Sequence, residues 1–443
     1  MKDELTLKTR REFLRTTVLG SALSWTVPTF LANTFATLNA DAANSATQIA
    51  TGKDSTILVV LQMAGGNDGL NTIVPFANDH YRKARPRIGL TEKQILRIND
   101  DVAFNQSLAG FKELYDGGQL SVIQGVGYPN PNRSHFRSTE IWQTASDAER
   151  FETSGWLGRY FDNACSGCDP EVAVTIGAQM PQAFAAKNAK GICFNNPQSY
   201  RFQKADQPGP GENDLMEASY RKLNDVDEAQ MENSGGSIGS LHGAAKHTGS
   251  ALDFIERTAL DAELSSAKIR AIAAKAENKA TYPQSQLANS LKLVAKLIGG
   301  GMATRVYYVS QGGYDTHGNQ AGTHDRLLGD LGGAVKAFVD DLKAQGNFER
   351  VLVMTFSEFG RRVSENASGG TDHGAAAPMF VFGNKVKAGL LGQHPNLAPT
   401  DLFQGDLKFT TDFRSVYAGV LEGWLKTRSA PVLGGKFEPL GLV

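Results

Sequence analysis

The chain has 443 residues, with 45 Lys and Arg against 46 Asp and Glu, so its formal net charge at pH 7 is −1. This length suffices for one large α/β domain or two smaller ones, and 41% hydrophobic with 21% charged residues is ordinary for a globular protein. The balanced charge and the lack of a basic stripe argue against nucleic-acid binding.

An export signal is predicted at the N-terminus. "TRREFLR" (9–15) precedes a short apolar run at 17–32, and small residues lead to "ADA" at 40–42. A twin-arginine pair, a short apolar run and an A-x-A site are typical of a leader that is removed during export through the twin-arginine translocase. The apolar run is shorter than the roughly 20 residues of a membrane-spanning helix, so no span is expected in the mature protein. We predict a signal peptide over 1–42, a linker over 43–54 and a periplasmic or otherwise exported mature chain.

Strand and helix patterns alternate after the linker. A continuous apolar run opens the segment 55–71, and "LSVIQGVG" (120–127) is a second strand, with a helix between them from about residue 106. This βαβ pattern predicts that the two strands are parallel neighbours. Further strands are predicted within 171–177, 191–196, 303–317, 350–356 and 378–383, and helices at about 134–146, 248–279, 284–298, 321–345 and 412–425.

The alternation predicts the fold class. We expect a doubly wound, mostly parallel sheet flanked by helices, in a single α/β domain over 55–443. A polar stretch followed by helical patterns predicts a helical insertion at about 203–300.

Three cysteines occur, Cys165, Cys168 and Cys193. The "CSGC" pair (165–168) has the spacing of a zinc knuckle or a redox pair, but no second pair completes a four-ligand site. We favour a loop disulfide formed after export over unpaired thiols or a metal site. The partner of Cys193 is left open.

Polar clusters follow four of the predicted strands, where ligands bind in sheets of this class. Carboxylates and imidazoles from separate strands can hold divalent cations, and arginine binds phosphate or sulfate oxygens. The candidate metal ligands are Asp68, Asp315, His317, Glu358, Asp372 and His373. The candidate catalytic residues are Arg133, Ser134, His135 and Arg361.

Each candidate has an ordinary structural alternative. Asp68 between glycines suits an Asx turn, and Ser134 suits the N-cap of the following helix. Glu358 could pair with Arg361 or Arg362 rather than bind a metal. Asp315 and His317 are alternate positions on an extended segment, so both side chains point to one side.

Several motifs carry a family resemblance. "LVVLQMAGGNDGLNTIVPF", "GGYDTHGNQ", "SEFGRRVSENASGGTDHGAAAPMFVFG" and "TDFRSVYAGVLEGWL", behind a twin-arginine leader, closely resemble the bacterial family called domain of unknown function 1501. The resemblance covers essentially the whole mature chain. It supplies no substrate.

The order of elements is also distantly similar to the alkaline phosphatase and sulfatase superfamily. This resemblance implies a metal-binding role for Asp68, for Asp315 with His317, and for His373 in its His-Gly loop. It places the nucleophile at Ser134 or a neighbour. Glu358 takes the place of an Asp.

The chain departs from that superfamily in two ways. Phe359 stands where a metal-binding His is expected, and no cysteine lies at the nucleophile position, so the formylglycine of sulfatases cannot form there. These departures favour a single-metal or degenerate site over a two-metal site.

The sequence therefore predicts a periplasmic metal-dependent hydrolase of phosphate or sulfate esters. The substrate would be an anionic small molecule or a glycan ester, attacked by metal-bound water or by Ser134, and the cofactor a divalent ion such as Zn, Ca, Mg or Mn. The alternative is a non-catalytic exported protein that keeps the fold and a degenerate metal site. An oxidoreductase is disfavoured because no G-x-G-x-x-G follows the first strand.

Overall fold

The structure is a computed structural model that describes residues 55–165, 168–187, 191–198 and 265–443. The chain divides into two units, one of residues 37–196 and 269–443 and a smaller one of residues 1–36 and 197–268. The predicted signal peptide and linker, and most of the predicted insertion, lie outside the described residues.

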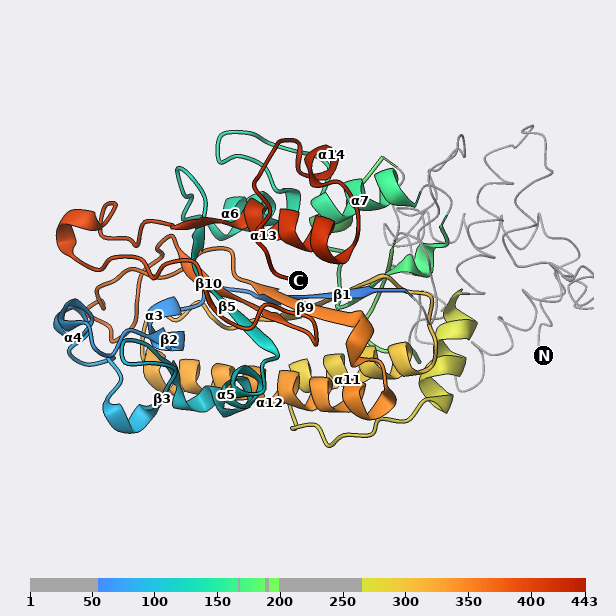
Figure 1. The fold of residues 1–443 in the computed structure, drawn as a ribbon, viewed down its shortest axis with the longest axis horizontal. Coiled ribbons are helices and arrows are strands. Elements are labelled where there is room, and N and C mark those ends of the chain that lie inside the picture. The colour runs from blue at the N-terminus through green and yellow to red at the C-terminus, as the bar shows by residue number, and fades with distance from the viewer. Residues whose placement is uncertain (1–54, 166–167, 188–190, 199–264) are drawn as a thin grey trace, which may run out of the picture. The chain divides into compact units, whose positions relative to one another are not determined.

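A central sheet forms the middle layer of the larger unit (Figure 1). Among the described residues its nine strands are ordered β11-β5-β10-β9-β1-β8-β6-β7, with β12 paired to β5. Their bounds are β1 Ile57–Met63, β5 Leu120–Gly127, β6 Ala173–Ile176, β7 Ile192–Phe194, β8 Val306–Gln311, β9 Val351–Phe356, β10 Ala377–Phe382, β11 Gly389–Leu391 and β12 Thr411–Asp412. A small separate sheet has the order β2-β4-β3, with bounds β2 Ile73–Val74, β4 Ala103–Asn105 and β3 Ile95–Arg97.

Helices cover both faces of the central sheet. In Figure 1, α6, α7, α13 and α14 lie on one face, and α5, α11 and α12 lie on the other. The α-helices that lie wholly within the described residues are α3 Gly69–Thr72, α4 Asp79–Ala84, α5 Ala109–Asp116, α6 His135–Thr144, α7 Trp156–Ala164, α11 Gln286–Gly299, α12 Gln320–Gln345, α13 Phe413–Gly419 and α14 Ser429–Leu433. Residues 265–275 are helical too. Single turns of 3-10 helix are η1 Glu92–Gln94, η2 Gln106–Leu108, η3 Pro170–Val172, η4 Gln182–Phe184, η6 Phe348–Arg350 and η7 Pro399–Asp401, and η8 Val420–Trp424 is a π-helix.

The prediction of a mostly parallel α/β sheet is confirmed. Strand β1 pairs in parallel with β8 on one side and β9 on the other, and all of its residues are buried. This burial on both faces explains the continuous apolar run that marked the strand in the sequence. Strand β10 is the exception, because it runs antiparallel to both β5 and β9.

The prediction that the first two long strands are neighbours is wrong. Strands β10 and β9 lie between β5 and β1 in the sheet. Strands β1 and β5 do run in the same direction. Strand β1 is parallel to β9, and β5 and β9 are both antiparallel to β10. The local βαβ pattern correctly predicted the relative direction of β1 and β5. Which strands lie next to them depends on segments more than 200 residues away in the chain.

Aromatic side chains fill the space between the sheet and the helices α6, α7 and α13. Trp142 stacks on Phe356 of β9 with ring centroids 5.6 Å apart and contacts Phe413 at 4.5 Å. Trp156 stacks on Tyr417 at 4.4 Å. Each such buried ring contributes roughly 1.5–3 kcal/mol of apolar burial, so this layer holds α6 firmly on the sheet.

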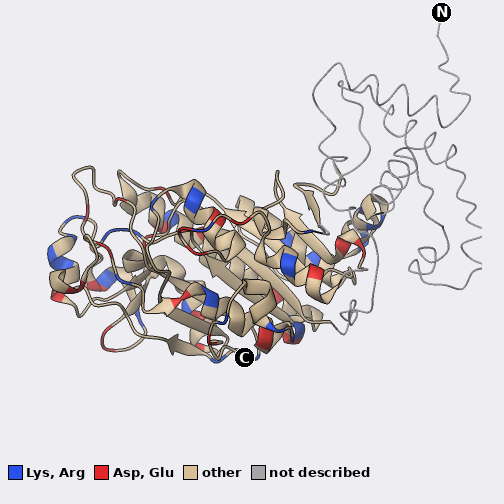
Figure 2. Cartoon of the chain, turned by 90° about the horizontal axis from the view of Figure 1, so that it is seen from above, with Lys and Arg blue, Asp and Glu red and all other residues tan. Residues whose placement is uncertain are grey.

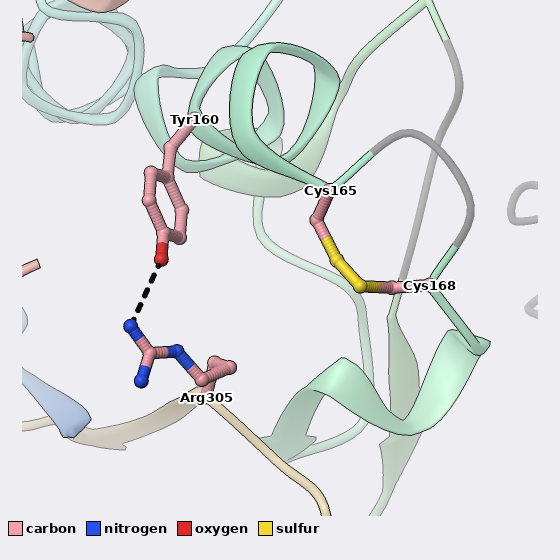
Figure 3. Close-up of a disulfide and its surroundings, with 4 residues drawn as sticks. All are labelled: Tyr160, Cys165, Cys168 and Arg305. Atoms are coloured by element: carbon pink, nitrogen blue, oxygen red, sulfur yellow. Dashed lines mark hydrogen bonds between the residues drawn. A yellow bond between two sulfur atoms is a disulfide. The ribbon is translucent and has the colours of Figure 1, made fainter. Parts of the chain in front are cut away.

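The predicted loop disulfide is confirmed. Cys165, at the end of α7, is bonded to Cys168 (Figure 3). Cys193 is buried and free, and burial raises the pKa of its thiol to about 12.

Charged side chains of both signs are interspersed over the helices and loops, while the strands of the sheet are nearly free of them (Figure 2). Within the described part of the chain, every helix is too short or too polar to cross a membrane.

Candidate metal centre

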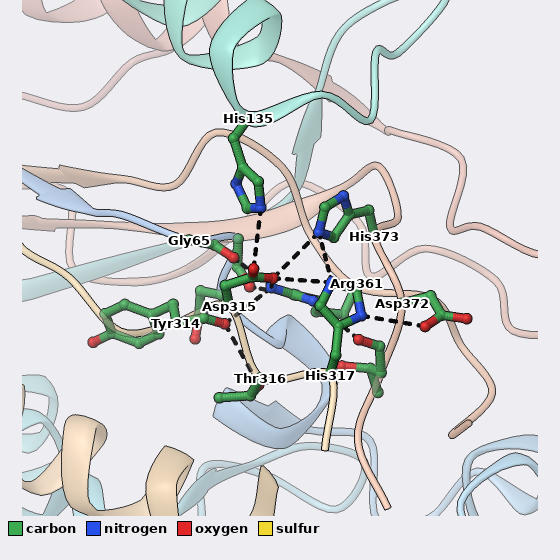
Figure 4. A network of polar contacts seen from close by, with 12 residues as sticks. Gly65, His135, Tyr314, Asp315, Thr316, His317, Arg361, Asp372 and His373 are labelled. Atoms are coloured by element: carbon green, nitrogen blue, oxygen red, sulfur yellow. Dashed lines mark hydrogen bonds and ion pairs between the residues drawn. The ribbon is translucent and has the colours of Figure 1, made fainter. Parts of the chain in front are cut away.

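Most of the predicted site residues come from segments that meet at the carboxyl ends of the neighbouring strands β9, β1 and β8 (Figure 4). His135 is the first residue of α6, Asp315 and His317 follow β8, Glu358 follows β9, and His373 lies in the loop before β10. Because β10 runs antiparallel to β9, its N-terminal end lies at the carboxyl end of β9. Segments distant in sequence thus deliver their side chains to one place, as ligand sites in such sheets require.

Asp315 is the centre of this cluster. Its Oδ1 lies 3.0 Å from His317 Nε2, 3.2 Å from His373 Nε2 and 2.7 Å from Arg361 Nη2. Its Oδ2 lies 3.4 Å from His135 Nε2. Three imidazoles therefore direct their Nε2 atoms at one carboxylate.

The Nδ1 atoms of two of these imidazoles are held by other groups. His373 Nδ1 donates to the carbonyl oxygen of Arg133 at 2.7 Å. His317 Nδ1 lies 3.3 Å from Asp372 Oδ1. A backbone carbonyl can only accept, so a neutral His373 carries its proton on Nδ1 and presents a lone pair on Nε2.

The third imidazole is held by a buried carboxylate. His135 Nδ1 lies 2.9 Å from Glu358 Oε1, which also accepts a hydrogen bond from the backbone N–H of Gly65 at 2.8 Å. Glu358 is only 2% exposed. Such partners on the second ring nitrogen are the usual support for metal-binding histidines, because they fix the tautomer and the ring orientation.

These donors fit a divalent cation. One ligand atom from each of His135, Asp315 and His373 can be chosen so that all lie within 4.8 Å of one another. His317 Nε2 and His373 Nε2 are 2.9 Å apart, and two lone pairs at that distance need a proton or a cation between them. A donor set rich in imidazole favours zinc and similar transition metals over magnesium or calcium, which prefer oxygen ligands.

The charge state of Asp315 suits this role. Partial burial raises its pKa, but the hydrogen bond from Arg361, the contact with His373 and the charge of Arg361 outweigh burial and lower the pKa to about 2. The carboxylate is therefore ionised at any physiological pH.

Arg361 is a structural residue of the site. Its side chain is fully buried, with Nε donating to Gly66 O at 2.7 Å and Nη1 donating to Thr371 O at 2.9 Å. Its Nη2 donates to Gly65 O and Tyr314 O as well as to Asp315. Every guanidinium nitrogen therefore donates a hydrogen bond within the protein. The sequence had suggested that this group binds an anion.

Asp68 lies in a different network. Its side chain is fully buried, and its Oδ2 accepts from Arg85 Nη1 at 2.6 Å and from Gln320 Nε2 at 2.5 Å. Arg85 also donates to the carbonyl oxygens of Arg362 and Val363. Asp68 therefore links β1 to α12 and, through Arg85, to the loop after β9, and it is not part of the Asp315 cluster.

Two other predicted residues lie at the start of α6. Ser134 is the N-cap, its side chain makes no capping hydrogen bond, and it is exposed beside His135. Arg133 forms an ion pair with the buried Asp406, at 2.5 Å from Nη2, and its side chain is 32% exposed. Asp406 was not predicted, because a lone Asp in a loop about 270 residues away carries no motif.

Asn366 was also missed by the sequence. Its Nδ2 donates to Asp372 Oδ1 at 3.1 Å and to the carbonyl oxygen of His317 at 2.9 Å. It thereby positions the carboxylate that holds the His317 ring. Its place in "SENASGG" looked like an ordinary turn residue.

The close approach of the loops depends on glycine. Gly65 has φ +121°, and a Cβ there would lie 2.5 Å from the backbone nitrogen of Asp315. Gly66 has φ +78°, and a Cβ there would overlap the ring of Phe359. The "GG" after β1 is thus required for packing against the metal-centre loops.

The chain belongs to the family described as "Protein of unknown function (DUF1501)", whose model matches residues 55–433. No curated protein sequence matches it.

Similar solved structures include a sulfatase from Pseudoalteromonas sp., with 11% identity, 86% of this chain and 68% of that chain covered, and a TM-score of 0.33. A protein in the alkaline phosphatase superfamily from Vibrio parahaemolyticus has 10% identity over 83% of this chain and 70% of its own, with a TM-score of 0.31. The lipoteichoic acid synthase LtaP from Listeria monocytogenes has 9% identity over 82% and 76%, with a TM-score of 0.33. These are the classes that the sequence resemblance named, but scores of this size carry no argument about activity.

We expect the purified protein to bind about one zinc ion per chain, and Asp315→Asn or His373→Ala to weaken that binding at least about tenfold, because each change removes a ligand atom. The measurement is metal content by mass spectrometry after chelation and reloading, with affinity from competition against a chromophoric chelator. His80→Ala, at an exposed histidine outside the cluster, is the matched control. Equal zinc binding by all four proteins would contradict the assignment.

We expect Arg85→Met to lower the free energy of unfolding by about 3–5 kcal/mol, because it leaves the Asp68 carboxylate buried without a counter-charge. The double variant Asp68→Asn/Arg85→Met should lose less than the sum of the single variants. Urea unfolding measures both. Lys112→Met breaks the exposed Lys112–Asp116 pair and should cost no more than about 1 kcal/mol. Additive losses in the cycle would argue against the coupling.

The Asp68 pair also predicts a pH dependence of stability. Burial raises the pKa of Asp68, but the charge and hydrogen bond of Arg85 lower it below the usual value of 3.8. The stabilisation is therefore complete above the unfolded pKa and is lost as the pH falls toward the folded pKa. Between about pH 6 and pH 3, wild type should lose more unfolding free energy than Asp68→Asn. Parallel curves would refute this account.

Proposed function

We propose that the protein is an exported, zinc-dependent hydrolase of phosphate or sulfate esters. The observation that carries the proposal is the convergence of His135, His317 and His373 on Asp315, each ring held by a second partner. So many ionisable groups gathered at one solvent-accessible point, with the Asp315 side chain 47% exposed, suit a ligand-binding site. Export through the twin-arginine translocase is proposed from residues 1–42 alone.

The residues divide into those that hold the metal and those that meet the ester. The four converging side chains would hold Zn²⁺, which would polarise the ester and activate the attacking water. Arg133 would bind the ester oxygens, because its side chain is partly exposed and Asp406 holds its guanidinium. Glu358 keeps the His135 ring oriented throughout.

The attacking group is either water or the Ser134 hydroxyl. Ser134 is exposed, makes no capping bond, and lies directly before His135 at the N-terminus of α6. Backbone N–H groups at that helix end favour an anion nearby. Both alternatives use the same metal ligands.

A non-catalytic metal-binding protein is the second candidate. Phe359 is 1% exposed and packs against the rings of His135 and His373, with centroids 4.9 and 4.6 Å away. Arg361 is fully occupied within the protein. Both observations favour a centre that keeps loops together rather than one that turns over a substrate.

We expect the zinc-loaded protein to hydrolyse p-nitrophenyl phosphate or p-nitrophenyl sulfate, and Asp315→Asn to lower kcat/KM at least about 100-fold, because it removes the central ligand. The measurement is release of p-nitrophenol. Asp116→Asn, an exposed change of the same chemistry on α5, should match wild type.

Ser134→Ala separates the two attacking groups. Loss of turnover with unchanged zinc content would identify the hydroxyl, and unchanged turnover would identify water. Stoichiometric zinc with no hydrolysis of either ester would refute the enzyme and leave the metal-binding protein.

A further inference from the structure

A cavity lies at the same carboxyl end of the sheet as the metal centre. It has a volume of about 360 Å³ and is formed by the ends of β1, β8 and β6, by α6 and by the segment 177–182. This volume is within the range of ligand pockets, roughly 300–1,000 Å³. Among the described residues, those that line it carry no charge, and most are amides or hydroxyls.

A chain of hydrogen bonds crosses the floor of this cavity. Gln143 Nε2 donates to the Tyr308 hydroxyl at 3.2 Å, and that hydroxyl donates to Gln62 Oε1 at 2.6 Å. Burial raises the pKa of Tyr308 above its usual value of 10, so the hydroxyl keeps its proton. Gln62 is 8% exposed and Gln143 is 7% exposed.

The chain leaves one donor and one acceptor without a protein partner. Gln62 has used its oxygen and presents its NH₂ group, and Gln143 has used its NH₂ group and presents its oxygen. No described residue bonds these two atoms, and neither is shielded from solvent. If both side-chain amides were rotated by 180°, Gln62 would present its oxygen and Gln143 its NH₂ group. One donor and one acceptor would still face the cavity.

This combination of one free donor and one free acceptor matches a ligand with adjacent hydroxyl groups. Each hydroxyl both donates and accepts, so a vicinal diol can satisfy an amide N–H and an amide carbonyl together. A charged ligand would find no counter-charge, and a purely apolar ligand would leave buried polar atoms unpaired. Gln179 and Ser310, both exposed, add further neutral polar groups at the opening.

One lining residue is hydrogen-bonded to a neighbouring loop that exposes an aromatic ring. Gln182, which lines the cavity, donates to the carbonyl oxygen of Glu152 at 3.1 Å. Phe151, the residue before Glu152, is 76% exposed, and the Arg137 guanidinium lies 4.0 Å from its ring centre.

We propose that this cavity, hereafter the amide cavity, binds an uncharged carbohydrate residue. Gln143 is eight residues after His135 in α6, so the cavity lies roughly 12 Å along that helix from the metal centre. The inference goes beyond the hydrolase proposal, because sugar binding needs neither the metal nor turnover.

The test is calorimetric titration of the full mature chain with neutral tetrasaccharides of glucose, mannose, galactose and N-acetylglucosamine. We expect at least one to bind with a Kd below about 1 mM, and Gln143→Met and Gln62→Met to weaken it about tenfold. Gln179→Ala, at an exposed position that cannot disturb the core, should weaken the same binding severalfold. Gln393→Met, an exposed amide after the edge strand β11, on the side of the sheet away from β8 and β6, should bind as wild type.

Asp315→Asn distinguishes this inference from the hydrolase proposal. Sugar binding that persists in Asp315→Asn supports the amide cavity, whatever happens to turnover. Binding lost with Asp315→Asn but retained in the glutamine variants would place the sugar at the metal centre and overturn the inference. Failure of every tetrasaccharide to bind would overturn it as well.

Discussion

The ion pair between Arg361 and Asp315 is the interaction on which the site depends. A buried guanidinium is stable only when its N–H groups are paired, and Arg361 satisfies them with carbonyls of Gly65, Gly66, Tyr314 and Thr371 and with Asp315. These partners belong to the loops after β1 and β8 and the loop before β10. One side chain therefore fixes three loops and the central carboxylate together.

Around that pair, the imidazoles are positioned by groups that do not compete for the metal. Glu358 and Asp372 engage the Nδ1 atoms of His135 and His317, and a backbone carbonyl engages His373. Glu358 and Asp372, which the sequence suggested as metal ligands, thus contact the imidazoles that would bind the metal. This arrangement orders the Nε2 lone pairs before any cation arrives, which lowers the entropic cost of binding.

The sequence predicted the layer order of the fold well but not the strand order. Apolar runs and helical periodicity are local, so β1, β8, β9 and α12 could be recognised directly. The insertion of β10 and β9 between β1 and β5 depends on long-range packing, which leaves no local pattern.

The same distinction applies to the candidate site. Asp315, His317 and His373 were recognised because D-x-H and His-Gly segments follow strands, where sheet geometry brings them together. The roles within the cluster were less predictable. His135 was considered for catalysis and Glu358 as a ligand, whereas the structure pairs them, because side-chain partners are set by the tertiary contacts of α6. Asp68 and Asp315 were both predicted as metal ligands, but Asp68 is buried and paired with Arg85.

The number of metal ions that the cluster can hold follows from where the carboxylates are used. A second cation would need further free ligands, but Asp68 is neutralised by Arg85 and the Asp315 carboxylate already serves Arg361. Phe359 fills the space against His135 and His373 where another ligand would have to enter. Filling that space with an apolar ring excludes water and stiffens both imidazoles. The described residues of the cluster therefore support one cation rather than two.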